Sequence, residues 1–176
     1  MQRIFLTGLA GVGKTTIGHR TASLLGWSFV DTDHMLAERM GMLVGQVLVE
    51  YGEERFRELE SEVLHELGNG ARVVIATGGG IVISPANRKF MREHGLTVYL
   101  QASAETSWRR MQEAGEEMSR PLLAGGNGLQ RLRDLYTARR AWYEEAAIHI
   151  NTEEGSPNDL ARQLISQALA HGLYSE

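Results

Sequence analysis

A glycine-rich segment near the N-terminus combines the residue types that bind phosphate. Residues 8–15, GLAGVGKT, fit the pattern G-x-x-x-x-G-K-[ST], and they stand between a short apolar run and a helical pattern. The backbone N–H groups of such a loop point into a concavity, and the N-terminus of the following helix adds about half a positive charge. We therefore expect a nucleotide phosphate to bind at Gly11, Val12, Gly13, Lys14, Thr15 and Thr16.

Lysine is rare in this chain, which makes its position in the pattern informative. Lys14 and Lys89 are the two lysines among 18 basic residues, and Lys14 stands at the motif position. A compact cation there can reach phosphate oxygens, and the hydroxyl of Thr15 is a ligand type that Mg²⁺ accepts. The alternative is a glycine-rich turn that binds nothing, which would give no reason for Lys14 and Thr15 to stand at these positions.

Two of the four aspartates, Asp31 and Asp33, come at the end of the strand predicted at residues 28–31. Ligands of open α/β sheets bind at the carboxyl ends of the strands. Along an extended segment both carboxylates would share one face, so that Asp31 could hold a magnesium-bound water and Asp33 could accept the proton of a substrate hydroxyl. The alternative is that these aspartates cap the following helix.

Several arginines have a spacing or a context that suits anion binding. Arg57 and Glu60 stand one helical turn apart, where the carboxylate could orient the guanidinium, although surface ion pairs often have this spacing. Arg120 lies in a loop-like segment and could close over a transferring phosphate. Arg139 is followed by Arg140 in a helical pattern, and an arginine there could bind a carboxylate by a two-bond fork. For Arg120 and Arg139 the alternative is a side chain exposed to solvent.

Three consecutive glycines, Gly78, Gly79 and Gly80, come shortly after the strand predicted at residues 73–76. In a parallel sheet they stand at the same edge as the phosphate loop and the aspartates. Without side chains, their backbone N–H groups can meet a small hydroxylated ligand directly, whereas a tight turn rarely needs three glycines. We therefore expect a substrate to contact this segment.

The elements that must position these residues alternate between short apolar runs and longer helical patterns. This alternation favours βαβ units and a three-layer α/β/α fold with a parallel sheet. Between residues 33 and 67 the pattern is helical with breaks near Gly41 and Gly52, which predicts a helical insertion. The pair Ser84–Pro85 predicts the start of a helix. Residues 113–128 predict a mobile loop. The five predicted strands span residues 3–7, 28–31, 73–76, 97–100 and 148–150.

The composition restricts the partners and the compartment. The chain has 176 residues, the size of one domain, and its 18 basic and 22 acidic residues give a net charge of −4 with no basic tract, so nucleic acid and anionic membranes are not expected partners. The absence of cysteine excludes disulfides, thiol catalysis and thiolate-bound zinc and favours the cytoplasm. The apolar run at residues 4–6 is too short for a signal peptide or a membrane span, and the six histidines lack metal-ligand spacing.

The order of these motifs resembles the shikimate kinase family over nearly the whole chain. The motifs are the phosphate loop, DTD, FRxxE, TGGG, RPLL and a late Arg-x-x-x-Tyr, and the segments GEERFRELESEVL and VIATGGGIVISPANR are similar to family signatures. The combination of DTD with the triple glycine distinguishes this family from gluconate kinases and nucleoside monophosphate kinases, which share the phosphate loop.

The resemblance implies an α/β P-loop fold of the nucleoside monophosphate kinase type, with strand order 2-3-1-4-5. It implies ATP-dependent phosphorylation of the 3-hydroxyl of shikimate, a step of aromatic amino acid biosynthesis, with one Mg²⁺ ion as cofactor. We expect the protein to be a monomer. The implied catalytic residues are Asp33, as the base, Lys14 and Arg120. The implied ligands of the nucleotide are the phosphate-loop residues, Arg120 and Ser156, and those of the metal are Thr15 and Asp31. The implied ligands of shikimate are Asp33, Arg57, Gly78, Gly79, Gly80 and Arg139.

The resemblance also divides the chain, as one kinase domain over residues 1–176. The expected core comprises residues 1–32, 61–111 and 128–176, the substrate-binding region residues 33–60, and the lid residues 112–127. Where the family usually has Arg-x-Pro-Leu-Tyr this chain has RRAWY, which leaves both Arg139 and Arg140 open as the carboxylate ligand. Two other interpretations remain: a nucleotide-binding protein that has lost phosphoryl transfer, and a kinase that acts on gluconate or a nucleotide.

Overall fold

Five short strands form the centre of the protein, whose structure is a computed structural model that describes residues 2–68, 72–116, 121–123 and 125–173. They pair in parallel in the order β2-β3-β1-β4-β5, which confirms the expected topology. All five lie where the sequence predicted strands, within one residue at each end. The strands are β1 (Arg3–Thr7), β2 (Ser28–Asp31), β3 (Val73–Ala76), β4 (Leu96–Gln101) and β5 (Ile148–Asn151).

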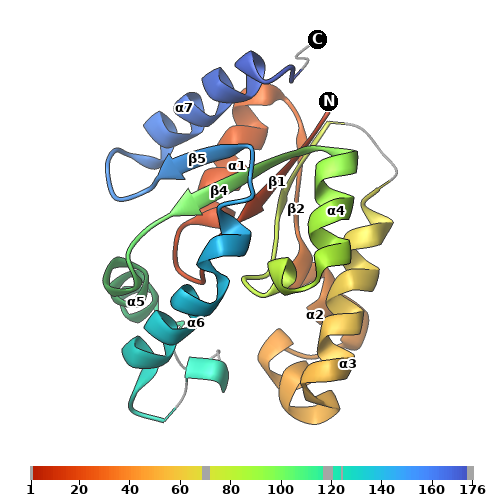
Figure 1. Cartoon of the computed structure of the whole chain (residues 1–176), viewed down its shortest axis with the longest axis vertical. Helices are drawn as coiled ribbons and strands as arrows, with labels where there is room; N and C mark the ends of the chain where they lie inside the picture. The colour runs from red at the N-terminus through yellow and green to blue at the C-terminus, as the bar shows by residue number, and fades with distance from the viewer. Residues whose placement is uncertain (1, 69–71, 117–120, 124, 174–176) are drawn as a thin grey trace.

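Helices cover both faces of this sheet (Figure 1). α1 and α7 pack together on one face, and α4 covers the other face beside α3 and the C-terminal end of α6. The first three helices are α1 (Lys14–Leu25), α2 (Thr32–Met40) and α3 (Val44–Glu66). The later helices are α4 (Pro85–His94), α5 (Ala104–Glu113), α6 (Gly128–Tyr143) and α7 (Pro157–Ala170). Two 3₁₀ turns are η1 (Ile81–Ile83) and η3 (Pro121–Leu123).

The central strand β1 has a continuous apolar run because both of its faces are covered. Ile4, Phe5 and Leu6 are fully buried, as is typical of a strand in the middle of a parallel sheet. β5 lies at the sheet edge and alternates between buried and exposed residues. The apolar pattern of each strand therefore follows from its place in the sheet.

The segment between β2 and β3 forms a helical insertion with a small core of its own. Leu36, Val47, Phe56, Leu59 and Val63 form an apolar cluster separate from the main core. α2 ends at Gly41 in the left-handed conformation, and α3 is interrupted at Gly52, where φ is 79° and ψ is 165°. Both predicted breaks are confirmed, while the division of the chain into core, substrate-binding region and lid stays a prediction.

The strand ends and the two projecting parts of the molecule share one side. Figure 1 shows that α2 with the first half of α3, and α5 with α6 and η3, extend beyond the same end of the sheet. In the part of the chain that the structure describes, no helix is long and apolar enough to cross a membrane. The two helical projections therefore flank the same end of the sheet.

The interior of α1 offers a test of packing against helix propensity. A Cβ atom on Gly18 would lie 2.5 Å from Phe29 Cε2 and 3.0 Å from Leu6 Cδ1. Alanine in place of a helical glycine usually adds about 1 kcal/mol of stability, but overpacking costs about 1–3 kcal/mol. We expect Gly18→Ala to lower the free energy of unfolding in urea by a net amount on the order of 1 kcal/mol.

The control is Ser23→Ala, at an exposed position of the same helix, which should be neutral or slightly stabilising. A Gly18→Ala protein more stable than the parent would mean that α1 does not pack against β2 as described.

Candidate active site

The phosphate loop, the acidic segment and the triple glycine meet at the carboxyl ends of three neighbouring strands. They follow β1, β2 and β3, which pair in parallel, so the segments leave the sheet at one edge. A Cβ atom on Gly79 would lie 3.5 Å from both Ala10 N and Gly8 O, so the triple glycine is in contact with the phosphate loop. The three segments therefore form one site, as the sequence predicted.

The phosphate loop has the backbone that its glycines allow. Gly11 and Gly13 have φ values of 79° and 102°, and a Cβ atom on Gly11 would lie 2.5 Å from Ser107 O in α5. Lys14 Nζ donates hydrogen bonds to Gly8 O and Leu9 O, each at 2.7 Å. The lysine ammonium is thus held over the loop, at the concavity where a phosphate would bind.

Asp31 connects the start of α2 to the phosphate loop. Its Oδ1 accepts hydrogen bonds from Asp33 N at 2.9 Å and His34 N at 3.3 Å, so it is the N-cap of α2. Its Oδ2 accepts a hydrogen bond from Thr15 Oγ1 at 2.9 Å. The interpretation of Asp31 and Asp33 as one face of an extended segment is wrong, because Asp33 already lies in the first turn of α2. Asp31 is thus a helix cap, as the alternative predicted, but its Oδ2 still faces Thr15 of the phosphate loop.

Asp33, Arg57 and Glu60 crowd against the triple glycine. A Cβ atom on Gly78 would lie 2.6 Å from Asp33 Oδ1 and 2.7 Å from Glu60 Oε1. Gly78 N also donates a hydrogen bond to Thr32 Oγ1 at 3.1 Å. The glycines are therefore needed to admit side chains of the protein, a reason that the sequence did not reveal.

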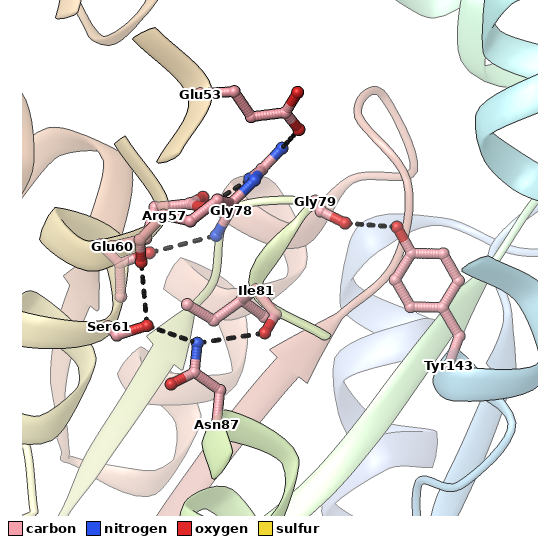
Figure 2. Close-up of polar contacts among 10 residues, drawn as sticks. Glu53, Arg57, Glu60, Ser61, Gly78, Gly79, Ile81, Asn87 and Tyr143 are labelled. Atoms are coloured by element: carbon pink, nitrogen blue, oxygen red, sulfur yellow. Dashed lines mark hydrogen bonds and ion pairs between the residues drawn. The ribbon is translucent and has the colours of Figure 1, made fainter. Parts of the chain in front are cut away.

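The pair of Arg57 and Glu60 is not a solvated surface pair, because Glu60 is buried and the side chain of Arg57 is only 20% exposed. Arg57 Nη1 donates to Glu60 Oε2, and Arg57 Nη2 contacts Glu53 Oε1 at 3.5 Å (Figure 2). Glu60 is only 5% exposed. Burial raises the pKa of Glu60 from 4.5 to about 7, which Arg57 opposes and Asp33 reinforces. The Arg57–Glu60 ion pair thus lies within a cluster of charges that includes Asp33 and Arg139.

The end of α6 faces the triple glycine from the other side. Tyr143 Oη donates a hydrogen bond to Gly79 O at 2.5 Å (Figure 2), and burial raises the pKa of this hydroxyl while Arg139 lowers it. Arg139 is 7% exposed and also lowers the pKa of Glu60. Arg140 is exposed and pairs with Glu144 at 2.7 Å. Of the two arginines left open by the sequence, Arg139 is the one directed into the molecule.

Two residues outside the phosphate loop, Arg120 and Ser156, are also predicted to bind the nucleotide. Arg120 lies outside the described residues. Ser156 forms a capping box at the start of α7, where its Oγ donates to Asp159 Oδ2 at 2.6 Å. Pro121, which lies within the predicted lid, lines an open groove of about 520 Å³ together with Met42, Leu43, Gly45, Gln46, Val49 and Glu50.

Sequence reasoning missed two side chains that hold the site together. Arg110 in α5 donates to Val12 O at 3.3 Å and to Thr152 O at 2.6 Å, and so connects the phosphate loop to the end of β5. Asn87 in α4 donates to Ser61 and Ile81. Neither carries a local signal, because their partners are distant in the sequence or are backbone carbonyls.

A five-stranded parallel sheet in this order, with a phosphate loop after β1 and a helical insertion after β2, defines a P-loop kinase fold. The model of the shikimate kinase family matches residues 10–169. The chain is 40% identical to the shikimate kinase of Geobacter sulfurreducens (97% of this chain, 92% of that one). It is 39% identical to shikimate kinase 2 of Sodalis glossinidius (94% and 95%). This chain belongs to the shikimate kinase family.

A solved structure gives the same result for the fold. The shikimate kinase of Acinetobacter baumannii, in complex with shikimate, superposes with a TM-score of 0.92. Its sequence is 36% identical, and the match covers 99% of this chain and 96% of that one. The similarity therefore extends over the sheet and both helical projections.

The raised pKa of Glu60 predicts how stability depends on pH. Glu60 binds its proton in the folded chain up to about pH 7, whereas the unfolded chain releases it near pH 4.5, so the proton favours the folded state between these values. The contribution of Glu60 to stability should therefore fall as the pH rises from 4.5 to 7 and stay level above. We expect the free energy of unfolding of the parent, minus that of Glu60→Gln, to decrease over this range.

Urea unfolding at a series of pH values measures this difference. Glu58→Gln, at an exposed position in the same helix, is the control and should show no such decrease in this range. A difference that rises from pH 4.5 to 7 would contradict the burial of Glu60.

Proposed function

We propose that this chain transfers the γ-phosphoryl group of ATP to the 3-hydroxyl of shikimate, giving shikimate 3-phosphate in aromatic amino acid biosynthesis. Membership in the shikimate kinase family supports the reaction and the substrates. The observation that carries the proposal is the contact of Asp33 and Arg57 with a triple glycine that itself touches the phosphate loop. An acceptor bound at the glycines would thus lie beside the phosphate of ATP.

The phosphate loop binds ATP in this proposal. Backbone N–H groups of Gly11, Gly13 and their neighbours surround the β-phosphate, and Lys14 Nζ transfers its hydrogen bonds from the loop carbonyls to phosphate oxygens. Arg120 adds a second cation from the lid, and Ser156 lies near the adenine. Because most of the catalysis is positioning and charge stabilisation, the arrangement of these cations matters more than any covalent step.

Thr15 and Asp31 are the residues that would hold Mg²⁺. The chemistry of these two groups fits this ion, because Thr15 Oγ1 and Asp31 Oδ2 are oxygen donors only 2.9 Å apart at the phosphate loop. Among the described residues, no cluster of three metal-binding side chains exists, as suits an ion that keeps several waters and phosphate oxygens. The bound ion would neutralise charge on the phosphates.

Shikimate is a trihydroxy carboxylate, and the residues around the triple glycine match both kinds of group. Arg57 and Arg139 bind the carboxylate by forked hydrogen bonds, and the backbone of Gly78, Gly79 and Gly80 contacts hydroxyls. Asp33 binds the hydroxyls and accepts the proton of the reacting one. Glu60 holds the guanidinium of Arg57 in place by accepting a hydrogen bond from it.

The remaining elements of the proposal concern the form of the enzyme. The active unit in this proposal is a monomer. The chain has no cysteine and a net charge of −4, which supports function in the cytoplasm without nucleic acid or membrane partners. The catalytic unit would be the single domain described above.

A coupled assay of ADP release tests the activity. With ATP and Mg²⁺, we expect ADP formation to depend on added shikimate and to be far slower with gluconate or a nucleoside monophosphate. ATP binding without shikimate-dependent ADP release would instead support a nucleotide-binding protein. Faster release with another acceptor would redirect the substrate assignment.

Replacing the proposed base tests the mechanism. We expect Asp33→Asn to lower kcat by about 10² or more, because the amide cannot accept the hydroxyl proton, while ATP affinity is kept. Asp134→Asn makes the same chemical change at an exposed position of α6 and should keep near-normal kcat. A near-normal kcat in Asp33→Asn would remove Asp33 from the chemistry.

A further inference from the structure

One buried amide connects two of the elements that surround the triple glycine. Asn87, in the first turn of α4, is 2% exposed. Its Nδ2 donates hydrogen bonds to Ser61 Oγ at 3.0 Å, in α3, and to Ile81 O at 3.3 Å, in η1 (Figure 2). Ser61 is 26 residues away in the sequence, so the amide joins α3 to the start of α4 and to the neighbouring turn η1.

Ser61 passes this connection on to the turn that carries Arg57. Its Oγ accepts from Asn87 and donates a hydrogen bond to Arg57 O at 2.9 Å. The hydroxyl thereby uses its proton and one lone pair in the same chain of hydrogen bonds. The backbone of Arg57 is thus two hydrogen bonds away from the amide of Asn87.

The hydrogen bonds of Asn87 to Ser61 and Ile81, together with that of Ser61 to Arg57 O, form one link. Both ends of this link lead to the proposed substrate site. Ile81 directly follows Gly80, and a Cβ atom on Gly80 would lie 2.0 Å from Arg57 Nη1. The guanidinium therefore rests on the glycine with no space between them. A small displacement of α3 relative to η1 would either press the two groups together or open a gap, and it would move the cation that meets the carboxylate.

The donor group of Asn87 is what the link requires. Its Oδ1 is buried and has no hydrogen-bond partner among the described residues, whereas Nδ2 has two. Since a buried amide oxygen without a partner is unfavourable, the residue contributes chiefly through its N–H groups. An aspartate of the same shape could donate neither hydrogen bond.

We propose that Asn87 is a positioning residue for the acceptor substrate: through Ser61 it sets the separation between Arg57 and the triple glycine. It contacts neither substrate itself. This inference rests on the proposed function, because it assigns Arg57 to the carboxylate of the acceptor. ATP binding depends on the phosphate loop, which the link does not reach.

Two variants remove the link from opposite ends. Ser61→Ala removes the hydroxyl and places a good helix former in α3, and Asn87→Asp keeps the shape but removes the donor. In each we expect the KM for shikimate to rise about ten-fold or more, with the KM for ATP changing by less than about two-fold. Should Asn87→Asp fail to fold, Ser61→Ala still gives the measurement.

The matched control is Leu164→Ala, a buried position in α7 on the other face of the sheet. It should lower the melting temperature without a selective rise in the KM for shikimate. A KM for shikimate that is unchanged in both link variants, or that rises only as much as the KM for ATP, would overturn the inference.

A double-mutant cycle checks that the effect runs through Arg57. In the background of Arg57→Lys, Ser61→Ala should raise the KM for shikimate by less than about two-fold, because the fork that it positions is gone. Additive effects would contradict the inference. These outcomes are distinct from failure of the proposed function, which would appear as no shikimate-dependent ADP release by the unmodified chain.

Discussion

The close approach of side chains to a backbone without Cβ atoms is the constraint on which the site depends. Gly78 leaves room for Asp33 and Glu60, and Gly80 leaves room for Arg57. Between them, Gly79 rests on the phosphate loop and accepts a hydrogen bond from Tyr143. A side chain at Gly78 or Gly80 would push these groups apart, so the packing of Asp33, Glu60 and Arg57 against this segment depends on the absence of a side chain at these two positions.

The charges around Glu60 are a second constraint on the same site. The carboxylate of Glu60 is buried, and the favourable charges near it are Arg57 and Arg139. Burial alone would keep this group protonated, since an uncompensated buried charge is costly. A pKa of about 7 means that small changes nearby shift its charge. Arg57 and Arg139 thus favour the charged form of Glu60, and in the proposed function the carboxylate of the substrate would compete for the same cations.

The sequence predicted what local signals determine. The strands, the order of the sheet, the helix breaks at Gly41 and Gly52 and the cap at Ser84 are confirmed, because each depends on nearby residues or on a family resemblance. The cap at Asp31 was an open alternative, since aspartate suits both caps and metal sites. The connections made by Asn87 and Arg110 depend on tertiary contacts and were missed. The roles of the site residues remain predictions.

The helix α3 contributes to both apolar clusters of the molecule, and its part after Gly52 takes part in each of them. Val47, before Gly52, and Phe56, Leu59 and Val63, after it, pack in the small cluster with Leu36 of α2, whereas Leu64 lies in the main core. Arg57 lies beyond the interruption, on the turn that Ser61 and Asn87 hold against η1. The substrate-binding region predicted at residues 33–60 therefore ends within α3. The turn of this helix that carries Arg57 is held by contacts with α4. In the proposed function, the cation that binds the acceptor is thus held through contacts with α4 and η1, whereas the groove beside Val49 and Pro121 is lined by residues before Gly52 and by Pro121.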